Sequence, residues 1–252
     1  MTVTVLTLKY GTAYGPEYVN RLRAGLMRHS SEPIRLLCMT DDRTGIHKDI
    51  EILDLAREPY EARLEMALAK APVRGRLKKV SLFRPGLVPN HEGALLVLDL
   101  DVVIVGNVAP IMRHAPGKVI MRKEWNAKPW QLGHGSVERI DPSLHGYLYN
   151  DMLKDTEGSV ALGRGSEQSY TSLNAERHGD FEAIPNEWVV SFKRDCRPVR
   201  PLNLLMSPRL PEGAIVVCFH GKPKMSDAVA GYRAGLHTTR RADWLTRAWS
   251  DE

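Results

Sequence analysis

The sequence lacks the features that would place the chain in a membrane or in an oxidising compartment. No apolar run reaches the roughly 18 residues that a membrane-spanning helix needs. The first residues, Met1 to Val5, lack the basic region and the long apolar core of a signal peptide. The three cysteines are an odd number without metal-site spacing, and Cys38 and Cys218 lie in strand-like runs that favour reduced core thiols. We therefore expect a cytoplasmic protein without a transmembrane segment.

Several functional motifs are also missing. The chain has no phosphate-binding P-loop, no Gly-x-Gly-x-x-Gly dinucleotide pattern and no catalytic triad. It shows no helix-turn-helix, RNA-recognition or zinc-finger pattern, and its basic residues are scattered, so nucleic acid is not an expected partner.

The net charge of +5 is confined to the last quarter of the chain. Residues 193–252 hold 11 Lys/Arg and 6 Asp/Glu, whereas residues 1–192 hold 24 of each. Such an excess would attract a nucleotide diphosphate, an anionic glycan or an anionic membrane surface, and the alternative is a solvated basic face.

The most informative stretch runs from Ala94 to Val105. Five apolar residues lead into Asp99 and four follow Asp101, which predicts a strand buried on both faces with the two aspartates at its end. Residues two apart in an extended chain point the same way, so the carboxylates would converge in the crevice where open α/β sheets bind ligands. Two such carboxylates favour a divalent cation between them. The alternative is a pair of solvated turn aspartates.

Short apolar runs alternate with amphipathic stretches along the chain, which predicts an α/β fold. A final helix over 241–250 would dock through Trp244, Leu245, Ala248 and Trp249, with a membrane-surface role as the alternative. The predicted strands cover 2–8, 34–39, 50–53, 118–122 and 214–219, and the predicted helices cover 16–29, 60–71, 77–83, 141–154 and 166–178.

Leu98-Asp99-Leu100-Asp101 resembles the Asp-x-Asp motif of glycosyltransferases with the GT-A fold, in particular the glycogenin-like and lipopolysaccharide-galactosyltransferase-like (family 8-type) group. The resemblance implies a Rossmann-like α/β fold with a mixed, mainly parallel sheet flanked by helices. It also implies a single domain over 1–252, with a nucleotide-binding half at 1–105 and a donor-sugar and acceptor half at 106–252. The other matching pieces, in the family's order, are Lys9-Tyr10-Gly11, Thr40-Asp41-Asp42, Lys78–Phe83, Ser166-Glu167-Gln168 and Phe219–Pro223.

The resemblance also implies a metal site. Asp99, Asp101 and His220 would hold Mn²⁺ or Mg²⁺, and an imidazole ligand suits Mn²⁺ better. Either Lys222 or Lys224 would face the diphosphate of the donor. The alternative for His220 is a structural histidine after a strand.

The nucleotide would be held by residues from the first half of the chain. By resemblance, Tyr10 or Tyr14 stacks on the base, Asp41 lies near the uracil or ribose, and Lys79 lies beside the sugar phosphate. The alternatives are tyrosines that pack the loop, an aspartate that caps a turn, and an ordinary surface lysine.

Gln168 and Glu167 are the residues expected beside the donor sugar. The family implies retention of the anomeric configuration with Gln168 near the reacting face, whereas an inverting enzyme could use Glu167 as its base. This chain departs from the family where Glu167 replaces an aspartate, and where His134 and Gly135 replace polar residues.

The sequence is therefore identified as a hexosyltransferase-type glycosyltransferase that uses a divalent metal and a nucleotide-sugar, by resemblance a UDP-sugar. Its partners would be that donor and a glycan or other hydroxyl acceptor, and a weak peripheral association with membranes stays open. The alternatives are a sugar-phosphate nucleotidyltransferase and a non-catalytic nucleotide-sugar-binding protein. The first would need an arginine-containing N-terminal phosphate loop, and residues 9–15 hold no arginine.

Overall fold

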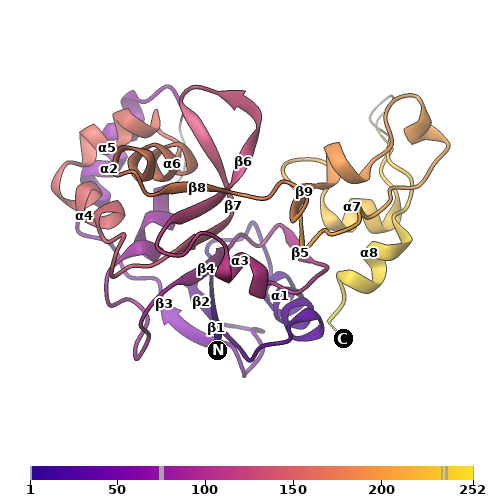
Figure 1. Cartoon of the computed structure of the whole chain (residues 1–252), viewed down its shortest axis with the longest axis horizontal. Helices are drawn as coiled ribbons and strands as arrows, with labels where there is room; N and C mark the ends of the chain where they lie inside the picture. The colour runs from indigo at the N-terminus through magenta and orange to yellow at the C-terminus, as the bar shows by residue number, and fades with distance from the viewer. Residues whose placement is uncertain (1, 74–76, 234, 236–237, 252) are drawn as a thin grey trace.

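The computed structural model describes residues 2–73, 77–233, 235 and 238–251. Within these residues, seven strands form a large sheet and three form a small one, with helices packed around both (Figure 1). The prediction of an α/β fold with a mixed, mainly parallel sheet is confirmed. None of the helices in this described part of the chain has the length and apolar character needed to cross a bilayer.

The large sheet has the strand order β3-β2-β1-β4-β7-β6-β8. The first four strands run parallel, β7 is antiparallel to both β4 and β6, and β8 is parallel to β6. The carboxyl ends of β1 and β4 therefore meet at one edge of the sheet, where ligands bind in such folds. The strands are β1 (Val3–Lys9), β2 (Ile34–Thr40), β3 (Glu51–Asp54), β4 (Leu95–Leu98), β6 (Val119–Lys128), β7 (Gln131–Ile140) and β8 (Phe181–Ile184).

Helices cover the two faces of this sheet because neighbouring residues of β1 point to opposite sides. Val5 joins a core with α1, whereas Leu6 joins a core with α2, α4, α5 and α6, which lie together in Figure 1. The predicted first helix is confirmed from Pro16 to His29. The helices are α1 (Pro16–His29), α2 (Glu61–Lys70), the 3₁₀ helix η1 (Leu77–Phe83), α3 (Ala109–Arg113), α4 (Tyr147–Lys154), α5 (Thr156–Gly163) and α6 (Glu167–Arg177).

Two helix predictions differ from the structure. The helix predicted over 141–154 begins only at Tyr147: Asp141 accepts a hydrogen bond from the Ser143 amide (3.0 Å) as a cap would, but the residues after it form turns up to Gly146. The stretch 77–83 is a 3₁₀ helix, and α5 had no prediction.

The small sheet contains β5 (Val102–Ile104), β10 (Val216–Cys218) and β9 (Val189–Ser191), in the order β5-β10-β9. The strand predicted before the Asp-x-Asp motif is confirmed as β4, with the aspartates following its end, but the apolar residues after Asp101 form a separate strand, β5, in the small sheet. The backbone explains the break: the Asp99 amide donates to Ser136 O on β7 (3.1 Å), and Asp101 O accepts from Phe219 N (2.8 Å). Each aspartate is thus tied to a different sheet.

The C-terminal lobe packs against the small sheet. It contains the π-helix η2 (Phe192–Cys196), the 3₁₀ helix η3 (Leu202–Leu204), α7 (Met225–Ala230) and α8 (Asp243–Ala248). The predicted docking helix is confirmed, since Leu245 is buried and the indoles of Trp244 and Trp249 pack against the same hydrophobic core.

Candidate active site

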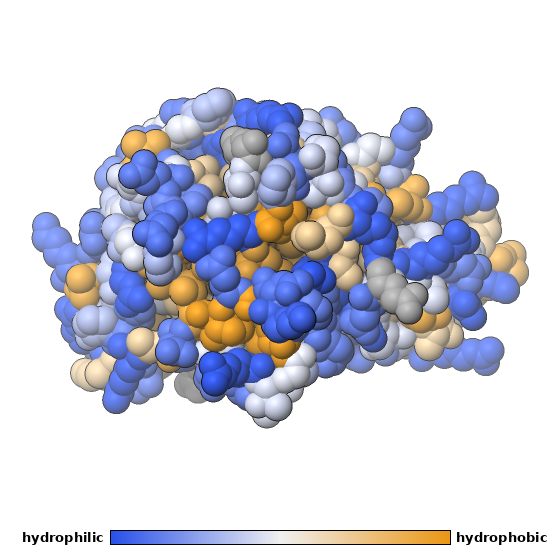
Figure 2. Space-filling model, turned by 90° about the horizontal axis from the view of Figure 1, so that it is seen from below, coloured by the Kyte–Doolittle hydropathy of each residue, from blue (hydrophilic) through white to orange (hydrophobic). Residues whose placement is uncertain are grey.

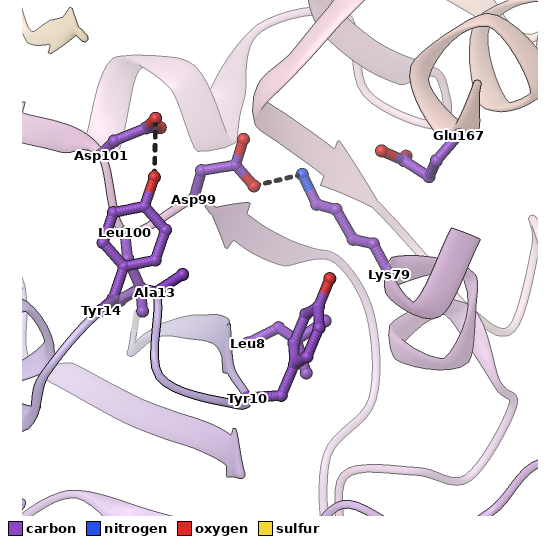
Figure 3. A pocket seen from close by; sticks show the side chains of 9 residues that line it. All are labelled: Leu8, Tyr10, Ala13, Tyr14, Lys79, Asp99, Leu100, Asp101 and Glu167. Carbon is purple, nitrogen blue, oxygen red and sulfur yellow. Dashed lines mark hydrogen bonds and ion pairs between the residues drawn. The ribbon is translucent and has the colours of Figure 1, made fainter. Parts of the chain in front are cut away.

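A cavity of about 250 Å³ opens at the carboxyl ends of β1 and β4. Figure 3 shows that both carboxylates of the Asp-x-Asp turn lie at this cavity, with Asp101 directed to Tyr14 on the loop after β1 and Asp99 directed to Lys79. The cavity therefore occupies the place that the sequence predicted for a ligand. Its lining residues are Leu8, Tyr10, Ala13, Tyr14, Lys79, Asp99, Leu100, Asp101 and Glu167.

Asp101 is held by two side chains. Its Oδ2 accepts a hydrogen bond from the Tyr14 hydroxyl (3.1 Å) and lies 3.4 Å from Lys224 Nζ, which also donates to the Tyr14 hydroxyl (3.1 Å). Burial and the Asp101 carboxylate raise the pKa of Tyr14, so its hydroxyl remains a donor. Lys222 instead pairs with Asp227 (2.9 Å) and is largely exposed, so the lysine that reaches the Asp-x-Asp turn is Lys224.

Asp99 faces a buried lysine on η1. Lys79 Nζ lies 3.1 Å from Asp99 Oδ1 and 3.2 Å from Glu138 Oε2, and it donates to the Gly135 carbonyl. Burial opposes the charge on Lys79, but its carboxylate neighbours outweigh that effect and raise its pKa. Lys79 is therefore a permanent ammonium fixed beside the cavity, and the surface-lysine alternative does not apply.

Glu138 on β7 is a site residue that the sequence analysis missed. It is fully buried, and burial raises its pKa well above the usual range, with a further contribution from Glu167. Neither carboxylate oxygen makes an aligned hydrogen bond to a donor, although Oε2 is ion-paired with Lys79. Glu138 is the one acidic residue of β7, placed directly after the apolar Val137, and that was the available signal.

Glu167 and Gln168 begin α6 and approach β7 closely. Glu167 lines the cavity and accepts a hydrogen bond from the Thr171 hydroxyl (3.1 Å), and burial raises its pKa despite the nearby Lys79. Gln168 Oε1 accepts from the Gly135 amide (3.0 Å). A Cβ at residue 135 would lie 3.2 Å from both side chains, so a glycine permits this approach.

His220 comes directly after Phe219, whose amide donates to Asp101 O, and its ring contacts side chains that do not line the cavity. Its Nε2 lies 2.7 Å from the Ser191 hydroxyl, and its ring stacks on Trp125 at 5.1 Å between centroids, with His134 close by. Burial lowers the pKa of His220, so the ring is neutral at physiological pH and can act as a ligand or a hydrogen-bond partner.

Asp41, like Lys222 and Lys224, is a predicted donor contact that lies outside the cavity lining. Its Oδ2 accepts a hydrogen bond from the Gly11 amide (2.9 Å) and so fixes the loop that carries Tyr10. Tyr10 itself lines the cavity (Figure 3), whereas the Tyr14 hydroxyl is committed to Asp101.

The two aspartates fit a divalent cation that completes its coordination with donor oxygens. Burial and the Asp99 charge raise the pKa of Asp101 to about 6, so the pair attracts positive charge, and Lys224 supplies some of it. Among the described residues, no three His, Cys, Asp or Glu side chains are arranged as a complete metal site. His220 would join the aspartates through Nε2 only after this nitrogen leaves the Ser191 hydroxyl.

The sequence matches no protein-family model and no curated protein. Solved structures do resemble it: the galactosyltransferase LgtC in complex with donor and acceptor sugar analogs gives a TM-score of 0.62 at 12% identity over 98% of this chain and 95% of that chain. This chain has a glycosyltransferase fold. Mouse xyloside xylosyltransferase 1 gives a TM-score of 0.56 at 14% identity, over 88% of this chain and 98% of that chain. The Streptococcus pneumoniae TIGR4 glycosyltransferase GlyE gives a TM-score of 0.55 at 12% identity, over 88% of this chain and 56% of that chain. The predicted likeness to GT-A glycosyltransferases is confirmed for the fold.

The position of His220 leads to a first prediction. His220→Ala is expected to weaken UDP binding about tenfold in Mn²⁺ and to change it little in chelator, because a ligand matters only when the metal is present. Isothermal titration calorimetry in both conditions measures the difference, with His178→Ala, outside the cavity lining, as the control. Equal losses in both conditions would mean that His220 acts only by packing against Trp125 and Ser191.

Proposed function

We propose that this protein is a metal-dependent glycosyltransferase that moves a sugar from a UDP-sugar to a hydroxyl group of a glycan or another acceptor. The observation that carries the proposal is the cavity where Asp99, Asp101 and Lys79 converge at the carboxyl ends of β1 and β4. A nucleotide diphosphate needs cations at such a crevice, and the glycosyltransferase fold supports this assignment.

The donor would be bound by residues of the large sheet's loops and by residues of the C-terminal lobe. Tyr10 would stack on the base, and Asp41 would accept from the base or the ribose at the loop that it fixes. Lys224, which already faces Asp101, would contact the diphosphate from the C-terminal lobe. A cation held by Asp99 and Asp101, with His220 as a third ligand, would supply further charge neutralisation to the leaving diphosphate.

The transfer breaks the bond between the anomeric carbon and a diphosphate oxygen, and the electron pair leaves with the diphosphate. The acceptor oxygen bonds to the same carbon and gives up its proton, which in a retaining reaction passes to the departing diphosphate. Gln168 can hydrogen-bond the sugar but is too weak a base to take that proton. Lys79 and Lys224 stabilise the charge that develops on the leaving group.

Glu167 would have a different part in an inverting reaction. Burial raises its pKa, which makes its carboxylate a better proton acceptor than an exposed one. We propose retention, because the Glu167 carboxylate is already engaged with Thr171 and lies close to Lys79.

A panel of nucleotide-sugars in Mn²⁺ tests the proposal. We expect UDP release from at least one UDP-sugar, its loss in chelator, and an α-linked product from an α-linked donor by NMR. Pyrophosphate release from a nucleoside triphosphate and a sugar phosphate would instead identify a nucleotidyltransferase. Donor binding without turnover, even with a range of hydroxyl acceptors, would identify a binding protein.

A further inference from the structure

The C-terminal lobe exposes a concentration of hydrophobic side chains that do not line the cavity. Six of the eleven large hydrophobic residues that are strongly exposed in the described part of the chain lie between 199 and 210. Val199 and Leu205 are 73% and 74% exposed, the two largest values among them. Figure 2 shows hydrophobic residues among hydrophilic ones at its right-hand end, where this lobe lies. The other four are Leu202, Leu204, Met206 and Leu210.

The same surface is positively charged. Residues 196–211 include Arg197, Arg200 and Arg209 but no Asp or Glu. A neighbouring cavity of about 620 Å³ is bordered by Leu204 and by the side chains of three arginines, at 233, 240 and 241. The acidic residue at its edge, Asp243, already pairs with Arg241 (2.8 Å). Positive charge therefore lies beside Leu204 and along the same segment as the exposed apolar side chains.

This segment is tied to the lobe at several points. The buried Asn203 donates from Nδ2 to Thr238 O (2.6 Å), and the Arg209 amide donates to Cys196 O (2.9 Å). The Trp244 indole donates to Pro208 O (3.2 Å). The backbone is thus held in place while Val199 and Leu205 stay in solvent, an arrangement that costs hydrophobic free energy unless something covers them.

We propose that this face, residues 199–210 with the arginine-lined cavity beside them, binds the surface of an anionic phospholipid bilayer. Apolar side chains would enter the boundary between headgroups and acyl chains, and the arginines would meet lipid phosphates. Charge complementarity favours this occupant, because an apolar protein surface would not need the arginines. The element differs from the helix considered in the sequence analysis, since Trp244 of α8 and the following Trp249 pack against the hydrophobic core.

The inference is independent of the proposed sugar transfer. If sugar transfer takes place, membrane binding would fix the orientation of the cavity, because the lobe that meets the bilayer also carries Lys224 at the Asp-x-Asp turn. Acceptors presented at a membrane surface would then approach the cavity from a fixed direction.

Co-sedimentation with vesicles tests the proposal. The full chain should pellet with vesicles of phosphatidylglycerol and phosphatidylcholine in equal parts, but not with phosphatidylcholine alone, and binding should fall as salt rises. The double variant Val199→Ser with Leu205→Ser should bind at least about tenfold more weakly. Arg233→Gln with Arg240→Gln should lose affinity about thirtyfold, because each of the two basic residues near such a surface contributes about 1 kcal/mol.

Met66→Ser is the matched control, because Met66 on α2 is 64% exposed and lies outside this face. It should bind like the unchanged chain, and circular dichroism should show that all variants fold. Failure to pellet with anionic vesicles, equal binding of the serine double variant, or equal binding to phosphatidylcholine would each overturn the proposal. So would a dimer in sedimentation velocity that the serine variant abolishes while vesicle binding is absent, since the occupant would then be a second copy of the chain.

Discussion

Asp101→Ala is expected to lower Mn²⁺-dependent UDP-sugar turnover by at least about a hundredfold while the protein stays folded. Metal-assisted stabilisation of a leaving group is worth several kcal/mol, and each 1.4 kcal/mol or so is a factor of ten in rate. The fold should survive because Asp101 lies in a turn between two sheets and its side chain contacts Tyr14 and Lys224, not the hydrophobic core. Donor hydrolysis measured over a Mn²⁺ titration gives the rate.

Asp54→Ala provides the control for that experiment. Asp54 ends β3 in the same sheet but lines no part of the cavity, so its removal should leave turnover unchanged. Near-normal turnover by Asp101→Ala at saturating metal would contradict the proposal that Asp101 is a ligand of the metal needed for turnover.

Lys79→Met is expected to lower the free energy of unfolding by about 3–5 kcal/mol, the usual cost of breaking a buried ion pair. The change leaves the carboxylates of Glu138 and Asp99 without their cation, and Glu138 is fully buried. Urea unfolding at neutral pH measures the loss. Lys78→Met should cost less than about 1 kcal/mol, because the neighbouring Lys78 is 38% exposed and pairs with Glu61 near the surface.

A second substitution separates the contribution of Lys79 to protein stability from its contribution to turnover. Adding Glu138→Leu to Lys79→Met removes the stranded carboxylate and should restore most of the lost stability, because apolar pairs often replace buried ion pairs without cost. Turnover should stay low, since no ammonium would face Asp99 and the diphosphate. Recovered turnover in the double variant would show that Lys79 has only a structural part.

Local signals in the sequence predicted much of the fold. The first helix follows from Pro16 at its start and from Val19, Leu22 and Leu26 at helical spacing, and all three of these apolar residues are buried. The site was also found at a strand end, because the apolar run before Asp99 is long enough to identify β4. These features depend on residues close together in the chain.

The features that the sequence did not predict depend on distant pairings. The break between β4 and β5 follows from the ladder between β5 and β10, which no local pattern reveals. Lys222 and Lys224 look alike in the sequence, and only the path of the chain after His220 brings Lys224 to Asp101. Glu138 was missed for the same reason, since its partner Lys79 lies on another element.

The small sheet has a consequence for the order in which the molecule folds. Ile104 pairs with Val216, so this ladder closes a long loop, and pairings of that kind form late because the loss of chain entropy precedes the gain in contacts. The parallel strands β1, β2 and β3 pair over much shorter separations. A nascent molecule would therefore present Asp99 and Asp101 before Lys224 reaches them, and the cavity at the Asp-x-Asp turn would be among the last parts to acquire its native form.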